Sequence, residues 1–533
     1  MYSITSPTVS HLVEIQAEDS ATVIALRREL DNKSRELDSK ARELAWAQLK
    51  IQVLEERLRK QRIAQYGPAA EKLSTAQLEL LDLEPGVCRE EVEAEAGRDT
   101  EVLVRRKSKR ESERPPGRQT LPEELPRVEK IVKLDEAQCA CGACGRCLEV
   151  IGYETSEQLD IEPAKYFVRV TKREKRACGA CKQAGVKTAA VEPRIVEKSL
   201  ASDRVIVDTV IAKYCDHLPL YRQSAMLERE TGVEIHRATM DGWVMRVGEL
   251  LLPVAEAMKR ELVAGSYLQA DETPVDVQVR EGKGKNHQAY LWQYSRPGAG
   301  AVFDFQMGRG REGPKKLLRH FAGILQTDGY SAYDKVGAPG VVHAACWAHA
   351  RRKFVDALKL NERDVEAARM VRRMDAIFAV DAEARACGLE AAERLALRRE
   401  KMAPLLDELR RELERLGREA LPASEFGKAV NYTRSLWKRL SLVLEQGELE
   451  LSNNLAENSM RGVALGRKNW IHVGSPEAGP KVAAILSVIE SAKRLGLPVR
   501  DYLLKVLPGM ADRKVSAVPA MTPQAWAESR KHG

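Results

Sequence analysis

Two acidic residues occupy matching places in the sequence, each directly after an apolar run. Asp271 follows the segment YLQA, and Asp328 follows the segment ILQT. Both segments are typical of strands, and turn residues (ETP and GYS) come after the acids. Two carboxylates brought side by side raise each other's pKa unless a cation lies between them. Because Mg²⁺ prefers oxygen ligands and keeps waters for a substrate, the pair predicts a Mg²⁺ (or Mn²⁺) site.

A third oxygen ligand is expected from a helix later in the chain, and Glu457 is the best candidate. It lies in the segment LSNNLAENSMRGVALGRKNW, where Asn453 and Arg461 share its helical face. These two side chains would contact phosphate or steady the acid, and the cations that follow, Arg467 and Lys468, would contact a nucleic-acid backbone. Glu490 on the next helix is a rival third acid without comparable polar neighbours. Two divalent ions about 4 Å apart would activate a water and stabilise the leaving oxygen of a phosphodiester.

A second metal site is predicted by two Cys-x-x-Cys pairs, each with glycine after its first cysteine. The pairs are Cys141 with Cys144 and Cys178 with Cys181. Four thiolates bind Zn²⁺ tetrahedrally in closed structural sites, and such pairs in a cytosolic chain favour metal over disulfides. Cys139 could replace Cys141, and Cys147 adds a further ambiguity, so the set Cys141, Cys144, Cys178 and Cys181 is a hypothesis.

The elements that must position the acids form a mixed set of strands and helices. Strands are expected at YLQADETPVDVQV, QAYLWQYSR, AVFDFQMG, GILQTDGYSAY and the start of GVVHAACWAHARRKF, with a short helix at GPKKLLRHF. Three antiparallel strands with a further parallel strand beside the first would set Asp271 next to Asp328. Residues 351–446 are almost wholly helical in pattern, and the segment PKVAAILSVIESAKRLG predicts another helix.

Regions outside this set differ in composition. A heptad of apolar residues over residues 20–64 predicts a coiled coil, hence self-association; its members are Val23, Leu30, Leu37, Leu44, Ile51 and Leu58. An amphipathic helix packed on its own domain is the alternative. Residues 200–262 predict three helices with a glycine-bearing turn, which suits a helix-turn-helix or a plain bundle. The segment YFVRVTKREKRA between the cysteine pairs predicts a strand.

The length, composition and charge of the chain limit the classes of protein to which it can belong. A chain of 533 residues with 44% apolar and 31% charged residues suits a multidomain globular protein. No run is apolar enough for a membrane span and no secretion signal is evident, so we expect a cytoplasmic protein without a membrane partner. The net charge of +8 is modest, but residues 105–118 hold seven Lys/Arg against two Glu. That cluster suits either a phosphate-binding arm or a solvated linker.

Several long motifs in one order make the chain similar to the DDE transposases of insertion sequence family 66, from about residue 60 to about residue 508. They are LPRVEKIV before the cysteine pairs, YETSEQLDIEPAKYFV, KYCDHLPLYRQ, DETPV, LQTDGYSAYD, CWAHARRKF and the segment NNLAENSMRGVALGRKNW. Relatives often carry Arg and then an apolar helix after the third acid, where this chain has Asn458, Ser459 and Met460. The resemblance therefore implies no contact for position 458.

This resemblance implies an α/β RNase H-like core, interrupted by a helical insertion before the third acid. It implies that Asp271, Asp328 and Glu457 are the catalytic, Mg²⁺-binding acids. Water activated at this site would cleave the transposon end, and the freed 3′-hydroxyl would attack target DNA. It further implies a zinc-binding domain that helps to grip the DNA ends, and accessory proteins of the same element.

The motif CWAHARRKF contributes further candidates. Cys346 and His349 resemble the Cys-x-x-His of several DDE families, with simple packing as the alternative. The cations that follow are expected to hold DNA phosphate; they are Arg351, Arg352 and Lys353.

The expected organisation is a coiled coil (1–83), a basic, Pro-rich linker (84–127), a zinc-binding β module (128–198) and a helix-turn-helix-like region (199–262). The catalytic core follows in two parts (263–354 and 448–500) around the helical insertion (355–447), with a tail (501–533). The predicted function is a DNA transposase acting at terminal inverted repeats near the bacterial nucleoid. The alternatives are a DNA-binding protein without activity and an RNase H-like nuclease outside transposition.

Overall fold

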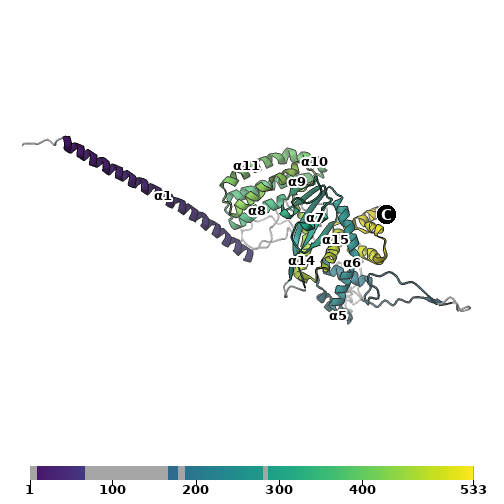
Figure 1. Cartoon of the computed structure of the whole chain (residues 1–533). Coiled ribbons are helices and arrows are strands. Elements are labelled where there is room, and N and C mark those ends of the chain that lie inside the picture. Colours follow the sequence, from purple (N-terminus) through teal and green to yellow (C-terminus); the bar gives the residue numbers. More distant parts are fainter. Residues whose placement is uncertain (1–8, 67–165, 178–185, 280–285, 532–533) are drawn as a thin grey trace, which may run out of the picture. The chain divides into compact units, whose positions relative to one another are not determined.

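The structure is a computed structural model that describes residues 9–66, 166–177, 186–279 and 286–531 (Figure 1). Its contacts divide the chain into two units. One contains residues 1–100 and 191–533, and the other contains residues 101–190. We describe each unit by itself. No helix in the described ranges is long and apolar enough to cross a membrane.

The centre of the larger unit is a mixed sheet with the strand order β5-β4-β3-β6-β7. Strands β3, β4 and β5 are antiparallel neighbours, whereas β6 and β7 run parallel to β3. All five strands lie where the sequence patterns predict them. Their bounds are Tyr267–Val277 (β3), His287–Ser295 (β4), Ala301–Gln306 (β5), Ile324–Thr327 (β6) and Val342–Ala345 (β7).

Strand β3 continues through the residues ETP, which the sequence indicated as a turn directly after Asp271. It pairs with β4 along its length, so Asp271 lies inside the strand and not at its end. Its other edge is shared: β6 pairs with Tyr267–Gln269, and the two-residue strand β8 (His472–Val473) pairs with Asp276 and Val277. Among the described residues no strand pairs with that edge between these two segments. The sheet therefore has a gap on the edge of β3 where Asp271 lies.

Helices cover the sheet, and their apolar faces join its residues in one core. Helices α6 and α15 pack against each other and against β5, and α14 packs against β3 and β4. The region predicted as helix-turn-helix-like contributes α4, α5 and α6 to this unit, and Gly232 ends α5 with a φ of +70°. The bounds are Asp203–Tyr214 (α4), Leu220–Thr231 (α5), Arg237–Val263 (α6), Glu312–Leu317 (α7), Asn454–Trp470 (α14), Ala478–Arg494 (α15), Val499–Val506 (α16) and Pro523–Lys531 (α17).

The predicted helical insertion builds a second apolar core, together with β7. Figure 1 shows its helices α8 to α11 as a green group beside the strands. A fully buried ion pair links two of its segments, since Arg398 Nη2 lies 2.6 Å from Asp381 Oδ1. The helices are Trp347–Leu360 (α8), Val365–Ala386 (α9), Ala391–Leu397 (α10), Ala403–Glu419 (α11), Glu425–Ser435 (α12) and Trp437–Leu440 (α13).

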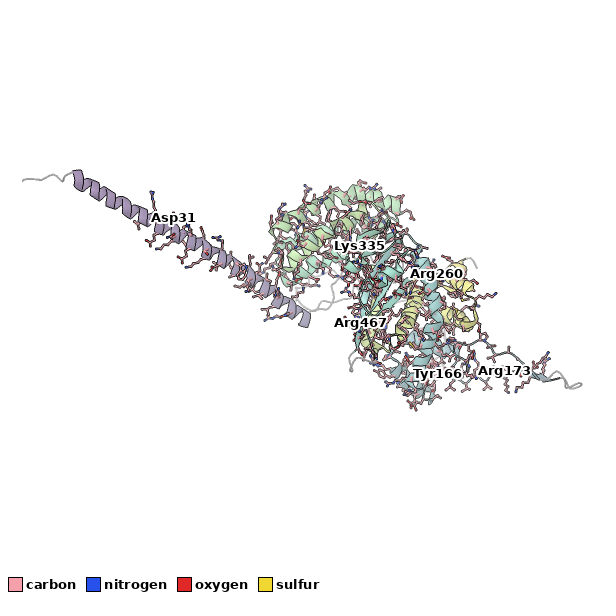
Figure 2. All side chains as sticks on the ribbon, viewed as in Figure 1. Asp31, Tyr166, Arg173, Arg260, Lys335 and Arg467 are labelled. Carbon is pink, nitrogen blue, oxygen red and sulfur yellow. The ribbon has the colours of Figure 1, made fainter. Side chains whose placement is uncertain are left out.

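The N-terminal segment is a single helix, α1, over Val9–Tyr66. Its described heptad residues are exposed: Leu30 by 71%, Leu37 by 68%, Leu44 by 62% and Leu58 by 60%. Figure 2 shows the side chains of this described part standing out along the helix. A helix with a regular apolar repeat left in solvent favours the predicted coiled coil.

The smaller unit is described only at a hairpin, β1 (Lys175–Ala177) with β2 (Val186–Thr188). The strand predicted over 166–177 is confirmed only for its last three residues. The preceding residues are exposed, Phe167 by 77% and Val168 by 88%, and no described strand pairs with them. The predicted zinc ligands Cys141, Cys144, Cys178 and Cys181 lie outside the described residues.

Candidate active site at the gap in the central sheet

The pairing of β3 with β6 places the two aspartates. Tyr267 pairs with Ile324, Leu268 with Leu325 and Gln269 with Gln326. Asp271 and Asp328 each follow two residues after the last of these pairs, so they lie at equivalent positions beyond it. Their charges interact accordingly, because Asp328 is one of the groups that raise the pKa of Asp271.

A tight turn fixes the carboxylate of Asp328. The backbone N–H of Tyr330 donates to Asp328 Oδ1 at 2.8 Å, and the N–H of Gly329 donates to Thr327 Oγ1 at 3.2 Å. Gly329 has a φ of +91°, a conformation that residues with a Cβ rarely adopt. A Cβ there would also lie 2.7 Å from Leu436 Cδ1 of the insertion. The positive φ therefore favours glycine in the turn after the second aspartate, and a Cβ there would also push the end of the Leu436 side chain aside.

Glu457 lies in the first turn of α14, the helix that packs against β3. Two side chains of α8 contact its carboxylate. Arg352 Nη2 lies 3.1 Å from Glu457 Oε2, and His349 Nδ1 lies 3.5 Å from Glu457 Oε1. The rival acid, Glu490, accepts from Arg494 on its own helix at 3.1 Å. The charge of Glu457 raises the pKa of Asp271, whereas Glu490 is not among the charges that do so.

Burial raises the pKa of Asp271 well above its ordinary value. The charges of Glu457, Glu272 and Asp328 raise it further. Glu272 itself is neutralised from the other side, because Arg309 Nη2 lies 2.7 Å from its Oε1 and the Tyr333 hydroxyl donates to its Oε2 at 2.9 Å. Sequence analysis missed this neighbour, although a second acid next to Asp271 was a visible signal.

Two buried glutamines support all three acids, and sequence analysis also missed them. Gln269 and Gln326 stand two residues before the aspartates, on the same face of their strands. Gln269 Nε2 donates to the Ser452 carbonyl at 2.9 Å, and Gln326 Nε2 donates to the Glu450 carbonyl at 2.7 Å. These bonds hold the segment that leads into α14, the helix that carries Glu457. The repeated pattern LQxD was the signal that could have identified them.

Cys346 links the starts of α8 and α14. Its Sγ accepts hydrogen bonds from the backbone N–H groups of His349 and Asn453, both at 3.4 Å. Burial, more than the nearby charge of Glu457, raises the pKa of the Cys346 thiol to about 12. The thiol is therefore protonated at neutral pH and acts as a structural acceptor. Burial also lowers the pKa of His349, which the charge of Glu457 only partly offsets.

Two residues expected to bind DNA are buried. Arg351 is 6% exposed and its Nε donates to Asp375 Oδ1 at 2.7 Å. Asn453 is fully buried, directly before α14, and not on the exposed helical face predicted for it. Neither side chain is accessible to a DNA backbone in this structure, so we do not retain these two expectations.

The remaining predicted DNA contacts are accessible to different degrees. Lys353 and Lys468 are exposed, whereas Arg352 and Arg461 are half-buried. Arg467, labelled in Figure 2, donates to Thr273 Oγ1 at 3.2 Å and to the Pro274 carbonyl. Through these bonds, the last turns of α14 are attached to β3 within the gap.

The donor set at the gap suits a divalent cation of the Mg²⁺ type. Three carboxylates supply hard oxygen ligands, and Asp271 is a buried acid whose raised pKa a cation would reverse. In the described part of the chain, however, no three His, Cys, Asp or Glu side chains form a group close enough to hold an ion. Glu457 is bound instead by the side chains of α8.

Comparisons with known proteins match most of this chain. A family described as "Transposase IS66 family" matches residues 198–481, which contain the sheet, the insertion and all three acids. A "zinc-finger binding domain of transposase IS66" matches residues 138–182, and "Transposase C of IS166 homeodomain" matches residues 53–129. The zinc-finger match contains all four predicted cysteine ligands.

Curated relatives from Sinorhizobium fredii (strain NBRC 101917 / NGR234) are similar over nearly the whole chain. The uncharacterized protein y4jD is 32% identical, over 76% of this chain and 81% of its own length. The uncharacterized protein y4hP is 28% identical, over 90% of this chain and 88% of its own length. Their names assign no activity.

The mixed sheet, the acidic gap and these matches define a DNA-processing enzyme of the transposase class, which binds DNA. Within this class, the chain belongs to the IS66 family of transposases.

Proposed function

We propose that this protein is a DDE transposase with an RNase H-like core, which cleaves and joins DNA at the terminal inverted repeats of its insertion sequence. One observation carries the proposal: Asp271 and Asp328 both follow two residues after the last β3–β6 pair, and the charges of Asp328 and Glu457 both raise the pKa of Asp271. The strand order, with an antiparallel meander followed by two parallel strands, agrees with an RNase H-like core.

The three acids would hold divalent ions, which supply charge neutralisation at the scissile phosphate and lower the pKa of water. Asp328 is fixed by the Tyr330 N–H, so its carboxylate is oriented before substrate arrives. Glu272 is withdrawn from this role because Arg309 and Tyr333 bind both of its oxygens. The proposed metal ligands are therefore Asp271, Asp328 and Glu457. Glu272 lies beside them, but its oxygens are hydrogen-bonded to Arg309 and Tyr333.

The DNA is expected to approach the gap between β6 and β8. Exposed or half-buried cations on α8 and α14 would contact its phosphates; they are Arg352, Lys353, Arg461, Arg467 and Lys468. The zinc-binding domain would grip the transposon ends, and α1 would bring copies of the chain together, with accessory proteins of the element as further partners. The protein would act at the bacterial nucleoid.

An RNase H-like nuclease outside transposition is the second candidate, and a DNA-binding protein without activity is the third. The zinc-finger match and the long helix with exposed heptad residues favour transposition over a simple nuclease. The raised pKa of Asp271 favours a cation-binding site over an inactive relic.

A strand-transfer assay separates the three functions. It uses the terminal inverted repeats of the element, Mg²⁺ and a target plasmid, with wild type, Asp328→Asn and Glu490→Gln. We expect wild type and Glu490→Gln to cleave the ends and join them to the target, and Asp328→Asn to do neither. Cleavage without joining would support the nuclease. Binding without cleavage, or equal cleavage by Asp328→Asn, would contradict the proposed site.

A further inference from the structure

Glu457 is bound by a cation in this structure, and that cation comes from a different helix. Arg352 on α8 lies 3.1 Å from the Glu457 carboxylate, and the two side chains are 33% and 23% exposed. His349, one turn earlier on α8, lies 3.5 Å from the other carboxylate oxygen. Both oxygens of the third acid therefore face α8.

The backbone around this contact is held in place. The N–H of Trp347 donates to the Leu451 carbonyl at 2.8 Å, and Cys346 Sγ accepts from Asn453. These bonds join the start of α8 to the segment that leads into α14. Because these bonds hold the starts of both helices, the contact between Arg352 and Glu457 can form or break through a change of side-chain rotamers alone.

Arg352 differs from the arginine beside it. Arg351 is buried against Asp375, which makes it part of the insertion core. Arg352 is partly exposed. Its charge lowers the pKa of His349 and of Cys346, and the charge of Glu457 raises the pKa of both. It is therefore a cation at the edge of the acidic site that solvent, or DNA, can reach.

A divalent ion and a guanidinium compete for the same carboxylate. An ion shared by Glu457 and the aspartates would repel the guanidinium at this distance. A DNA phosphate at the site offers Arg352 a replacement partner, which a guanidinium binds in bidentate fashion.

We propose that Arg352 is a positioning residue that holds Glu457 in the DNA-free protein and transfers to a DNA phosphate when the site is loaded. The inference rests on the proposed function, because it assigns the ion and the DNA to this site. DNA binding would then release Glu457 from Arg352, so that Glu457 becomes available to bind the divalent ion.

The first test measures Mn²⁺ affinity of the zinc-loaded full chain without DNA. Arg352→Ala should bind Mn²⁺ about tenfold more tightly than wild type, because a charged hydrogen bond no longer competes for Glu457. Lys359→Ala is the matched control, since it removes another cation of α8, one that pairs with Asp356 at 3.2 Å, and it should change the affinity by less than about twofold. Asp271→Asn gives the background signal of other sites.

Unchanged or weaker Mn²⁺ binding by Arg352→Ala would overturn the proposal, as would equal tightening by Lys359→Ala. The milder variant Arg352→Gln gives the same reading if the alanine variant does not fold. If wild type and Asp271→Asn titrate identically, the site binds no ion, and the proposed function fails together with this inference.

The second test measures affinity for end DNA with Ca²⁺ present. Arg352→Ala should lose about tenfold, and Arg352→Lys should recover most of that loss because lysine also binds phosphate. A DNA affinity that is unchanged in Arg352→Ala would overturn the transfer to phosphate. A merely structural arginine would lower the melting temperature without tightening Mn²⁺ binding.

Discussion

At the scale of single residues, the site depends on the residues two positions before the acids. Gln269 and Gln326 are fully buried, and their amides hold carbonyl groups of the segment entering α14. The Tyr267 hydroxyl joins them by donating to Gln326 Oε1 at 2.5 Å. A buried polar network of this kind is stable only while its members are satisfied. The glutamines therefore connect the two strand acids to the helix acid.

Gln326→Leu tests this connection. It removes the donor to the Glu450 carbonyl and the acceptor of the Tyr267 hydroxyl proton, which should lower the free energy of unfolding by about 1–3 kcal/mol. Cleavage of end DNA should fall further than the loss of folded protein explains, since the entry to α14 shifts. Denaturant unfolding and cleavage rates measure the two effects. Gln288→Leu, on the exposed part of β4, is the control and should stay within about 0.5 kcal/mol; equal effects of both variants would contradict the role of Gln326.

Asp271→Asn tests the electrostatics of the gap. Because the folded-state pKa of Asp271 is raised by burial and by neighbouring acids, wild type loses stability as the pH rises through that pKa. Without added divalent ions, the variant should melt at the same temperature as wild type in acid and at a higher temperature at neutral pH. Added Mn²⁺ should remove this advantage. A difference in melting temperature that does not depend on pH would show that ionisation of Asp271 does not destabilise the folded protein.

At the scale of elements, the proposed site lies at the gap along one edge of β3, between β6 and β8. The insertion closes over one side of it, since Leu436 packs against Gly329 and the Tyr432 hydroxyl donates to the Asp328 carbonyl. The acids are thus positioned by the sheet on one side and by an inserted helical domain on the other.

Gly329→Ala tests the contact between turn and insertion. Both the positive φ and the clash with Leu436 oppose a Cβ, so we expect a loss of about 2–4 kcal/mol in the free energy of unfolding. Gly340→Ala is the matched control, because Gly340 has a similar φ of +94° and open space around it. It should cost only the backbone part, about 1 kcal/mol. Equal losses would mean that Leu436 does not press on the turn.

Local patterns predicted the elements, and the expected pairing of β3 with antiparallel β4 and parallel β6 is confirmed, but more distant contacts were not predicted. Strands β3 to β7 and the insertion helices follow from apolar runs and periodicity. The gap did not follow, because it depends on β8, a two-residue strand some 200 residues from β3. The burial of Arg351 depends on Asp375 on another helix, and the burial of Asn453 depends on the packing of the chain before α14. Long-range contacts of this kind leave no mark in the local sequence.

At the scale of the whole molecule, the chain that contains the proposed catalytic site also has an exposed apolar repeat on α1. Such a repeat is stable in water mainly when a second helix covers it. Leu37 and Leu44 are 68% and 62% exposed, one heptad apart. We therefore expect the protein to act as an oligomer assembled through this helix.

Replacing Leu37 and Leu44 together by Lys should dissociate that oligomer, because four charged groups cannot be buried in the seam of a dimer. Analytical ultracentrifugation at micromolar concentration measures the outcome. Asp38→Lys is the control. It changes the charge on the same helix at a position outside the apolar seam, and it should leave the mass of the oligomer unchanged. A wild-type protein that is monomeric, or a double variant of unchanged mass, would contradict assembly through α1.

The central claim is that Asp271, Asp328 and Glu457 together hold divalent ions against a DNA phosphate. The most direct measurement counts the Mn²⁺ ions bound at this site in the complex of the zinc-loaded protein with uncleaved end DNA. We predict about two ions per active site for wild type, with fewer for Asp328→Asn and for Glu457→Gln. A count that is the same in wild type and in both variants would contradict the claim.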